Sequence, residues 1–112
     1  MIGGGNYQTP ASATVNYLGV TISFIRIGNQ VTFTSSASAF NTSVVVGGTN
    51  NILPVGFRPA LQQNVYATNQ DGANKYFSLT ENGTIYSYSA YASGIQPRIS
   101  GSYITTDAWP NN

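Results

Sequence analysis

The sequence predicts an all-β domain, an antiparallel β-sandwich or β-barrel, on the basis of three observations. β-Branched and aromatic residues are common, whereas helix formers are scarce. No window of the chain repeats apolar residues at the helical period. Turn-forming residues recur about every eight to twelve residues, the spacing that short antiparallel strands require. The 112 residues fit one domain, which we expect over residues 13–112, after a linker over residues 1–12.

The first half of this domain is expected to contain a hairpin, a short strand and a long loop. Residues 20–27 and 31–34 alternate apolar and polar side chains and flank a turn at residues 28–30. A short strand at residues 43–46 ends at two glycines. Residues 52–59 include two prolines and a glycine, which indicates a structured loop rather than a central strand.

Four further strands are expected in the second half, at residues 62–69, 75–80, 84–90 and 96–105, with a turn at residues 69–72. The clearest hairpin turns across Glu81-Asn82-Gly83. A two-residue turn would pair Glu81 with Thr84, whereas a three-residue loop with Gly83 left-handed pairs Thr80 with Thr84. We favour the second register because it separates apolar from polar and tyrosine side chains far better. It puts on one face Phe77, Leu79 and Ile85, and on the other Asn74, Tyr76, Ser78, Tyr86 and Tyr88.

The predicted core follows from the same alternation of side chains. In residues 62–69, Val65 and Ala67 share one face, and Tyr66 lies on the other. The core is expected to contain Ile22, Phe24, Val31, Phe33, Leu53, Phe57, Val65, Phe77, Leu79, Ile85 and Ile99.

The low charge of the chain excludes several classes of partner. Charged residues make up 6% of the chain, and the net charge is +1. We therefore expect no binding to nucleic acid or to an anionic membrane, both of which need clustered cations. The sequence shows neither a secretory signal nor an apolar run long enough to span a bilayer. A surface of Ser, Thr, Asn, Gln, Gly and Tyr is typical of a domain that works within a larger assembly.

Few residues of this chain have the chemistry that catalysis needs. Histidine and cysteine are both absent, which removes the usual metal ligands and nucleophile–base pairs. Glycoside hydrolysis needs two facing carboxylates, but Asp71 and Glu81 both have a structural explanation in turns, which leaves Asp107. Lys75, the one candidate base for a hydroxyl nucleophile, has the position of an exposed charge at a strand end. We expect a binding protein without a metal or cofactor, and not an enzyme.

Saccharide recognition has more support, because sugars present apolar C–H faces and dense hydroxyl groups that suit aromatic rings and planar polar groups. Tyr76, Tyr86 and Tyr88, with Asn74 nearby, would form such a surface. They would equally suit packing against another subunit or a covering loop. Arg98 follows Pro97, which indicates a strand start or a sheet edge, and it is a candidate ligand contact or a surface charge.

Asp107 and Trp109 are the next candidates for the site. Trp109 lies close to the end of the sequence. We favour a role in covering the core or a subunit contact over stacking on a ligand. Arg58 is expected to fix its own loop through hydrogen bonds to backbone carbonyls.

Three segments together carry a family resemblance. They are Leu53-Pro-Val-Gly-Phe-Arg-Pro-Ala60, the hairpin Glu81-Asn-Gly-Thr-Ile-Tyr86, and the closing stretch Ile99-Ser-Gly-Ser-Tyr-Ile-Thr-Thr-Asp-Ala-Trp-Pro110. They resemble the C-terminal modules of tail-fibre and baseplate proteins from phages of Gram-positive hosts. Over about residues 20 to 110, the chain is similar to the head domain of lactococcal phage receptor-binding proteins.

This resemblance implies a trimeric β head at the tail tip of the virion, which binds host cell-wall saccharides, including phosphate-containing ones, without cleaving them. Residues 1–12 would join the head to a stalk and, through it, to the baseplate. In such heads the saccharide pocket lies near the contact between subunits and uses aromatic, arginine and acid or histidine side chains. Arg98, Tyr86, Tyr76 and Asn74 could fill these roles, although the chain has no histidine and no tryptophan in the hairpin. The alternative is a purely structural trimer-forming cap whose tyrosines are buried between subunits.

Overall fold

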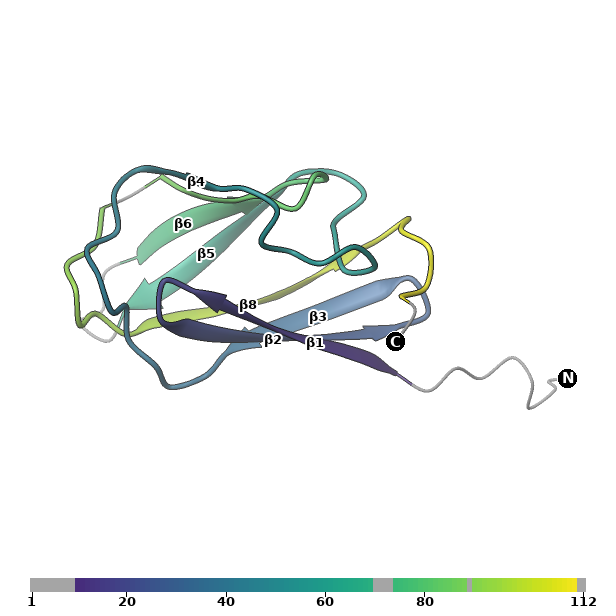
Figure 1. Cartoon of the computed structure of the whole chain (residues 1–112), viewed down its shortest axis with the longest axis horizontal. Helices are drawn as coiled ribbons and strands as arrows, with labels where there is room; N and C mark the ends of the chain where they lie inside the picture. The colour runs from purple at the N-terminus through teal and green to yellow at the C-terminus, as the bar shows by residue number, and fades with distance from the viewer. Residues whose placement is uncertain (1–9, 70–73, 89, 111–112) are drawn as a thin grey trace, which may run out of the picture.

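The domain is a single antiparallel sheet of eight strands, curled into a half-barrel around one core (Figure 1). This computed structural model describes residues 10–69, 74–88 and 90–110, and none of them is helical. The predicted all-β fold is therefore confirmed. The strands are β1 (Ala11–Tyr17), β2 (Val20–Ile27), β3 (Gln30–Ser35), β4 (Gly47–Thr49), β5 (Gln63–Asn69), β6 (Asn74–Leu79), β7 (Ile85–Ser87) and β8 (Pro97–Ile104). Their order in the sheet is β1-β2-β3-β8-β5-β6-β7-β4.

Strand β1 was not expected from the sequence. It pairs with β2 along its whole length, from Ala11 opposite Arg26 to Tyr17 opposite Val20. Its inward positions include the buried Ala11, Val15 and Tyr17, but alanine and polar residues between them hide the alternation in the sequence. The sheet thus starts two residues before the expected domain boundary at residue 13. Residues 1–9 of the expected linker lie outside the described residues.

The strand expected at residues 43–46 is wrong. Only Val44 there forms a bridge, to Tyr91, whereas Val45 and Val46 are exposed. The strand forms instead at Gly47–Thr49, where β4 pairs with β7. A Cβ atom on Gly48 would lie 3.0 Å from Thr84 Cγ2 and 3.2 Å from Tyr86 Cδ2, so the missing side chain lets β4 approach β7 closely. The valine content of residues 43–46 suggested a strand that the backbone pairing does not support.

The remaining strands agree with the sequence prediction except in length. β2 matches it, and β3, β5, β6 and β8 differ from it by one residue at one or both ends. β7 is the exception, because it covers Ile85–Ser87 instead of residues 84–90. Residues 52–59 form a loop, and the β2–β3 turn occupies Gly28 and Asn29 between the paired Ile27 and Gln30. Of the turn expected at residues 69–72, residues 70–72 lie outside the described residues.

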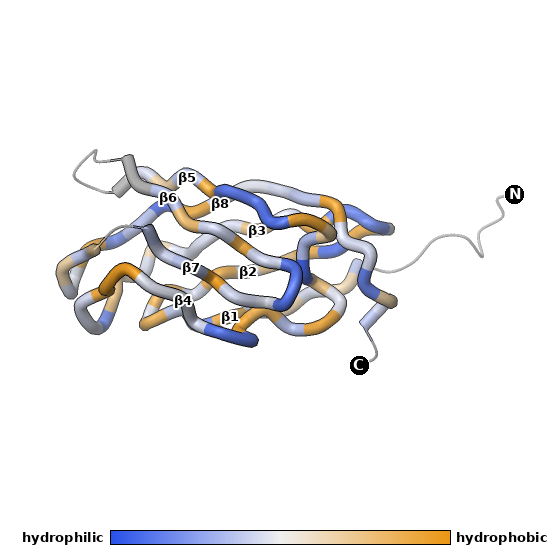
Figure 2. The backbone as a smooth tube through the Cα atoms, turned by 90° about the horizontal axis from the view of Figure 1, so that it is seen from above, coloured by the Kyte–Doolittle hydropathy of each residue, from blue (hydrophilic) through white to orange (hydrophobic). Residues whose placement is uncertain are grey.

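The register of the β6–β7 hairpin is the one that the sequence favoured. Leu79 pairs with Ile85, and Thr80 N donates a hydrogen bond of 3.0 Å to Thr84 O. Gly83 has a φ of +87°, in the left-handed region where glycine carries no Cβ penalty. All eleven predicted core residues are buried, and the structure adds to them large aromatic side chains: Tyr17, Phe40, Tyr91 and Tyr103. Figure 2 shows hydrophobic positions interleaved with polar ones along the strands, as expected where alternate side chains face the core.

Candidate functional site

Tyrosine side chains gather on the outer face of the sheet over β5, β6 and β7. Antiparallel pairing places Tyr66 of β5 opposite Tyr76 of β6, and Tyr88 N donates a hydrogen bond to Tyr76 O, which brings Tyr88 to the other side of Tyr76. Tyr86 precedes Tyr88 by two residues and pairs with Ser78. Because alternate residues of a strand share a face, these side chains point away from the core. We call Tyr66, Tyr76, Tyr88 and Tyr86 the tyrosine row.

The rings of the tyrosine row contact one another in sequence. Ring centroids are 5.7 Å apart for Tyr66 and Tyr76, 4.9 Å for Tyr76 and Tyr88, and 4.8 Å for Tyr88 and Tyr86. Tyr76 and Tyr88 are stacked at 25°, so each covers part of the other's ring. Tyr66, at one end of the row, is 72% exposed against 40% for Tyr76 and for Tyr88. Tyr66 therefore offers the most accessible ring face.

Hydrogen bonds beneath the row fix its position. Ser78 is fully buried although it belongs to the outer face. Its hydroxyl lies 3.0 Å from both Asn64 Oδ1 and Tyr88 Oη, and it accepts a hydrogen bond of 3.1 Å from Gln62 Nε2. A serine hydroxyl has one proton and two acceptor lone pairs, so three partners satisfy it completely. The network holds Tyr88, and through the stacked rings it also restricts Tyr76.

Arg98 lies beside the Tyr66 end of the row. Strand β8 pairs with β5 so that Arg98 is opposite Thr68 and Ile99 is opposite Ala67. Tyr66 precedes Thr68 by two residues on the same face of β5, so Arg98 lies on the diagonal from Tyr66. Such diagonal neighbours are about 7–8 Å apart, a separation that a long side chain can cross. Arg98 is exposed and borders a depression of about 240 Å³, which we call the arginine depression. Its lining residues are Thr34, Ser35, Arg98, Ile99 and Ser100.

The structure places on one face four of the residues that the sequence singled out, and the three tyrosines among them are in contact. Tyr76, Tyr86, Tyr88 and Arg98 all belong to the outer face, although Arg98 is next to Tyr66 and not to the hairpin tyrosines. Asn74 pairs with Thr68, but its side chain lies outside the described residues.

Tyr66 is the residue that the sequence reasoning missed. Its outward direction was predicted, because Val65 and Ala67 alternate with it. What was missing was the pairing of β5 with β6 and β8, which decides its neighbours.

Asp107 lies away from the tyrosine row. Asp107 follows the end of β8 at Ile104. At the rise per residue of an antiparallel strand, that end lies about 20 Å along the sheet from Arg98. Asp107 Oδ2 accepts hydrogen bonds from Gly56 N at 2.8 Å and from Arg58 N at 3.1 Å. The carboxylate therefore holds the loop of residues 52–59.

Trp109 covers a buried arginine at the same end of the molecule. The Arg26 guanidinium lies 4.9 Å from the Trp109 ring centroid, within the range of a cation–π contact. Trp109 also borders a separate depression of about 460 Å³ with Pro54, Val55 and Phe57. The structure does not bring Asp107 or Trp109 to the tyrosine row.

Two of the segments that carry the family resemblance contact each other. Leu53 N donates a hydrogen bond of 3.0 Å to Gly83 O, and Arg58 Nε donates one of 2.8 Å to Leu53 O. A Cβ atom on Gly83 would lie 2.6 Å from Arg58 Nε, so the guanidinium packs directly on the glycine. The expected role of Arg58 in fixing its loop is confirmed.

Burial perturbs three phenol groups of the core. Desolvation raises the pKa of Tyr17 to about 12, partly offset by a hydrogen bond with Ser87. Desolvation also raises the pKa of Tyr91 to about 12, with a further contribution from Tyr17. The pKa of Tyr103 rises above its usual value through desolvation and the nearby Asp107 carboxylate. These groups stay protonated at neutral pH and belong to the interior.

Comparisons with known proteins leave the geometry as the basis for function. No protein-family model matches the chain, and no curated protein sequence matches it. Within the described ranges, no three acidic, histidine or cysteine side chains group as metal ligands do. The part of the chain that the structure describes has no helix with the length and apolar character to cross a membrane.

Proposed function

We propose that this domain binds a host cell-wall saccharide without cleaving it, as the receptor-binding head of a phage tail tip. The observation that carries the proposal is the exposed ring of Tyr66 on the diagonal from Arg98, which itself lines the arginine depression. A tyrosine ring offers an apolar face to the C–H groups of a sugar. The planar guanidinium donates paired hydrogen bonds to vicinal hydroxyls or to a phosphate that links two sugars. Thr34 and Ser100 add hydroxyl groups to the same depression.

The restricted positions of the rings in the tyrosine row support the binding of a saccharide. Tyr66 contacts Tyr76, which stacks on Tyr88, and the Tyr88 hydroxyl is held by the buried Ser78. A ring that is already restricted loses little conformational entropy when a ligand covers it. Exposed aromatic rings that contact one another are also unusual on the free surface of a monomer, and such patches mark interaction sites.

Assignment to a phage tail rests on the sequence resemblance. The loop of residues 53–60 and the hairpin of residues 81–86 are its main carriers, and they contact each other through Leu53, Arg58 and Gly83. On this proposal the head is joined to the baseplate through residues that precede β1 and acts outside the host cell.

Three such heads would form a trimer, and an apolar patch on the outer face supports this. Ile27 and Ile104 flank Gln30 in one row of paired residues, and Ile25 lies one row away. Their side chains are 62%, 58% and 48% exposed in the single chain. We call Ile25, Ile27 and Ile104 the isoleucine patch. Burying it against a second copy would remove apolar surface from water, a gain of about 25 cal/mol per Å².

A glycan-binding screen with cell-wall fragments of Gram-positive hosts tests the function. We expect Tyr66→Ala and Arg98→Ala to weaken binding while the melting temperature stays nearly unchanged, because both side chains are exposed. Tyr66→Phe keeps the ring face and should bind as the parent does. Thr14→Ala, on the exposed face of β1, is the control away from the site. A parent protein that binds no fragment, with the tyrosine row protected inside a stable trimer, would instead support the structural cap.

A further inference from the structure

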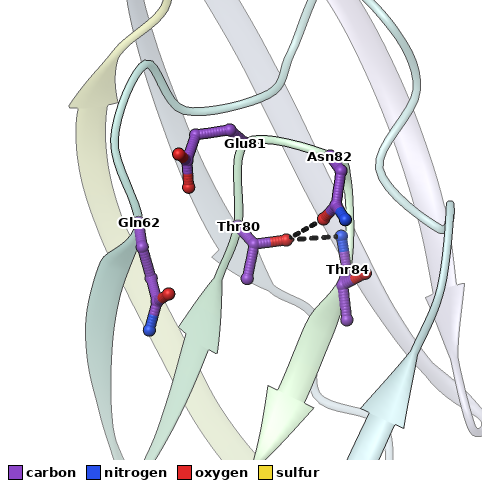
Figure 3. Close-up of a pocket in the computed structure, with 5 residues that line it drawn as sticks. All are labelled: Gln62, Thr80, Glu81, Asn82 and Thr84. Atoms are coloured by element: carbon purple, nitrogen blue, oxygen red, sulfur yellow. Dashed lines mark hydrogen bonds between the residues drawn. The ribbon is translucent and has the colours of Figure 1, made fainter.

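A further depression, of about 450 Å³, opens at the other end of the tyrosine row (Figure 3). It lies at the β6–β7 turn and is lined by Gln62, Thr80, Glu81, Asn82 and Thr84. We call it the turn depression. Thr84 precedes Tyr86 by two residues, a step of about 7 Å along an extended chain, so the turn depression begins where the tyrosine row ends.

A hydrogen-bonded connection joins the turn depression to the tyrosine row. Gln62 lines the depression and donates from Nε2 to Ser78, whose hydroxyl contacts Tyr88 Oη. The Gln62 amide is thereby oriented, and its carbonyl oxygen remains an acceptor. The two features therefore belong to one continuous surface.

The polar groups of the turn depression suit hydroxyl groups. Thr80 Oγ1 donates to Asn82 Oδ1 and accepts a hydrogen bond of 3.1 Å from Thr84 N, as Figure 3 shows. This bond uses the carbonyl oxygen of the Asn82 side chain and orients the amide, whose N–H groups are its donors. Glu81 is exposed on the Gln62 side of the turn and contributes a carboxylate, which only accepts hydrogen bonds. Figure 3 shows the Glu81 carboxylate and the Asn82 amide on opposite sides of Thr80. A hydroxyl group both donates and accepts, so different hydroxyls of one sugar match the acceptor on one side and the donor on the other.

Charge distinguishes the two ends of the surface. Arg98 lies beyond Tyr66, and Glu81 is the charged residue among those that line the turn depression. The Arg58 guanidinium packs on Gly83 of the same turn but does not line the depression, and the described side chains of the row itself are uncharged. An anionic group would be repelled by Glu81 and attracted by Arg98. The turn depression therefore fits an uncharged sugar, whereas the arginine depression also accepts a phosphate.

We infer that the turn depression is a second saccharide subsite, specific for an uncharged sugar, and that one glycan chain extends along the tyrosine row from Arg98 to Glu81. This inference rests on the proposed function. The ligand is then a chain of several sugars, and its orientation is fixed by the different charges at its two ends.

Binding by a size ladder of cell-wall oligosaccharides, from disaccharides to octasaccharides, tests the inference by calorimetry. We expect the parent to bind the long fragments at least about tenfold more tightly than the short ones, the gain of one charge-assisted hydrogen bond. Glu81→Gln removes the charge and keeps the size of the side chain. It should return the long fragments to the affinity of the short ones and leave the short ones unchanged. Thr14→Ala should change neither.

The outcomes separate the two proposals. If short and long fragments bind equally, or if Glu81→Gln leaves the long fragments unaffected, the second subsite is wrong and the site at Tyr66 and Arg98 stands. If Glu81→Gln weakens all lengths equally, Glu81 does not form a separate subsite, and the inference is again overturned. If no fragment binds to the parent at any length, the proposed function itself fails.

Discussion

Arg26 shows how one side chain can join segments that are far apart in the sequence. It is buried within the half-barrel, and its guanidinium donates five hydrogen bonds. The acceptors are the backbone oxygens of Gly28, Gly56, Asp107 and Ala108 and the side-chain oxygen of Asn29. Burial of a charge is costly, but here every N–H group of the guanidinium has a partner, and Trp109 covers it.

Replacement of this arginine should therefore destabilise the domain strongly. We expect Arg26→Ala to lower the free energy of unfolding by about 3 kcal/mol or more, because several buried carbonyl groups lose their donors. Urea denaturation of the variant and the parent measures the difference. Arg98→Ala is the matched control, because that arginine is exposed, and it should change stability by less than about 0.5 kcal/mol. A loss below about 1 kcal/mol for Arg26→Ala would contradict this account.

The buried phenols make stability depend on alkaline pH. The pKa of Tyr17 is about 12 in the folded chain and 10.0 as its ordinary value, so the unfolded chain loses this proton first. Unfolding is then favoured as pH rises, and the stabilising contribution, complete below pH 10, declines through pH 12. We expect the urea midpoint to stay level up to about pH 9 and to fall above pH 10. Tyr17→Phe, which cannot ionise, should reduce the slope, and an unchanged slope would assign the effect to Tyr91 and Tyr103.

At the scale of elements, local patterns were sufficient where apolar and polar side chains alternate clearly on both strands of a hairpin. The β6–β7 register followed from the alternation of Phe77, Leu79 and Ile85 with polar residues. It followed also from Gly83, which can adopt the left-handed conformation that the three-residue loop requires. Local patterns failed at β1, where alanine and polar residues hide the alternation although its partner β2 follows directly, and at β4, which pairs with the distant β7. The site divides in the same way, because the outward tyrosines of the hairpin were predicted, whereas the neighbours Tyr66 and Arg98 depend on the β5–β8 pairing.

The turn of the β6–β7 hairpin provides a sharp test of this register. Gly83→Ala places a Cβ atom at a φ of +87° and within 2.6 Å of Arg58 Nε, so the change combines backbone strain with a steric conflict. We expect a loss of about 1–3 kcal/mol in the free energy of unfolding. Gly94→Ala is a useful comparison, because that glycine also has a positive φ of +90° but no atom within 4 Å of its Cβ position. Equal losses in both variants would show that the contact with Arg58 contributes nothing.

At the scale of the whole molecule, the proposed trimer makes the isoleucine patch the region to test. Ile27 is 62% exposed in the single chain, so its replacement should not disturb the core. We expect light scattering to report three chains for the parent and a monomer for Ile27→Asp, because a charge in a buried contact is strongly unfavourable. A parent that remains a stable monomer of 11.9 kDa would contradict the trimer. If Ile27→Asp remains trimeric, the subunit contact lies elsewhere on the surface.

The position of β8 has a consequence for how the domain folds. β8 is the last strand in sequence, yet it lies between β3 and β5 in the middle of the sheet. Strands β1 to β3 form one meander by local pairing, and β5 to β7 form another, but among the described residues only β8 pairs with both. During synthesis both meanders emerge before the strand that unites them, so their inner apolar faces stay unjoined until residues 97–104 arrive. Pairing between distant parts of a chain slows folding, so we expect the insertion of β8 to be the slow step.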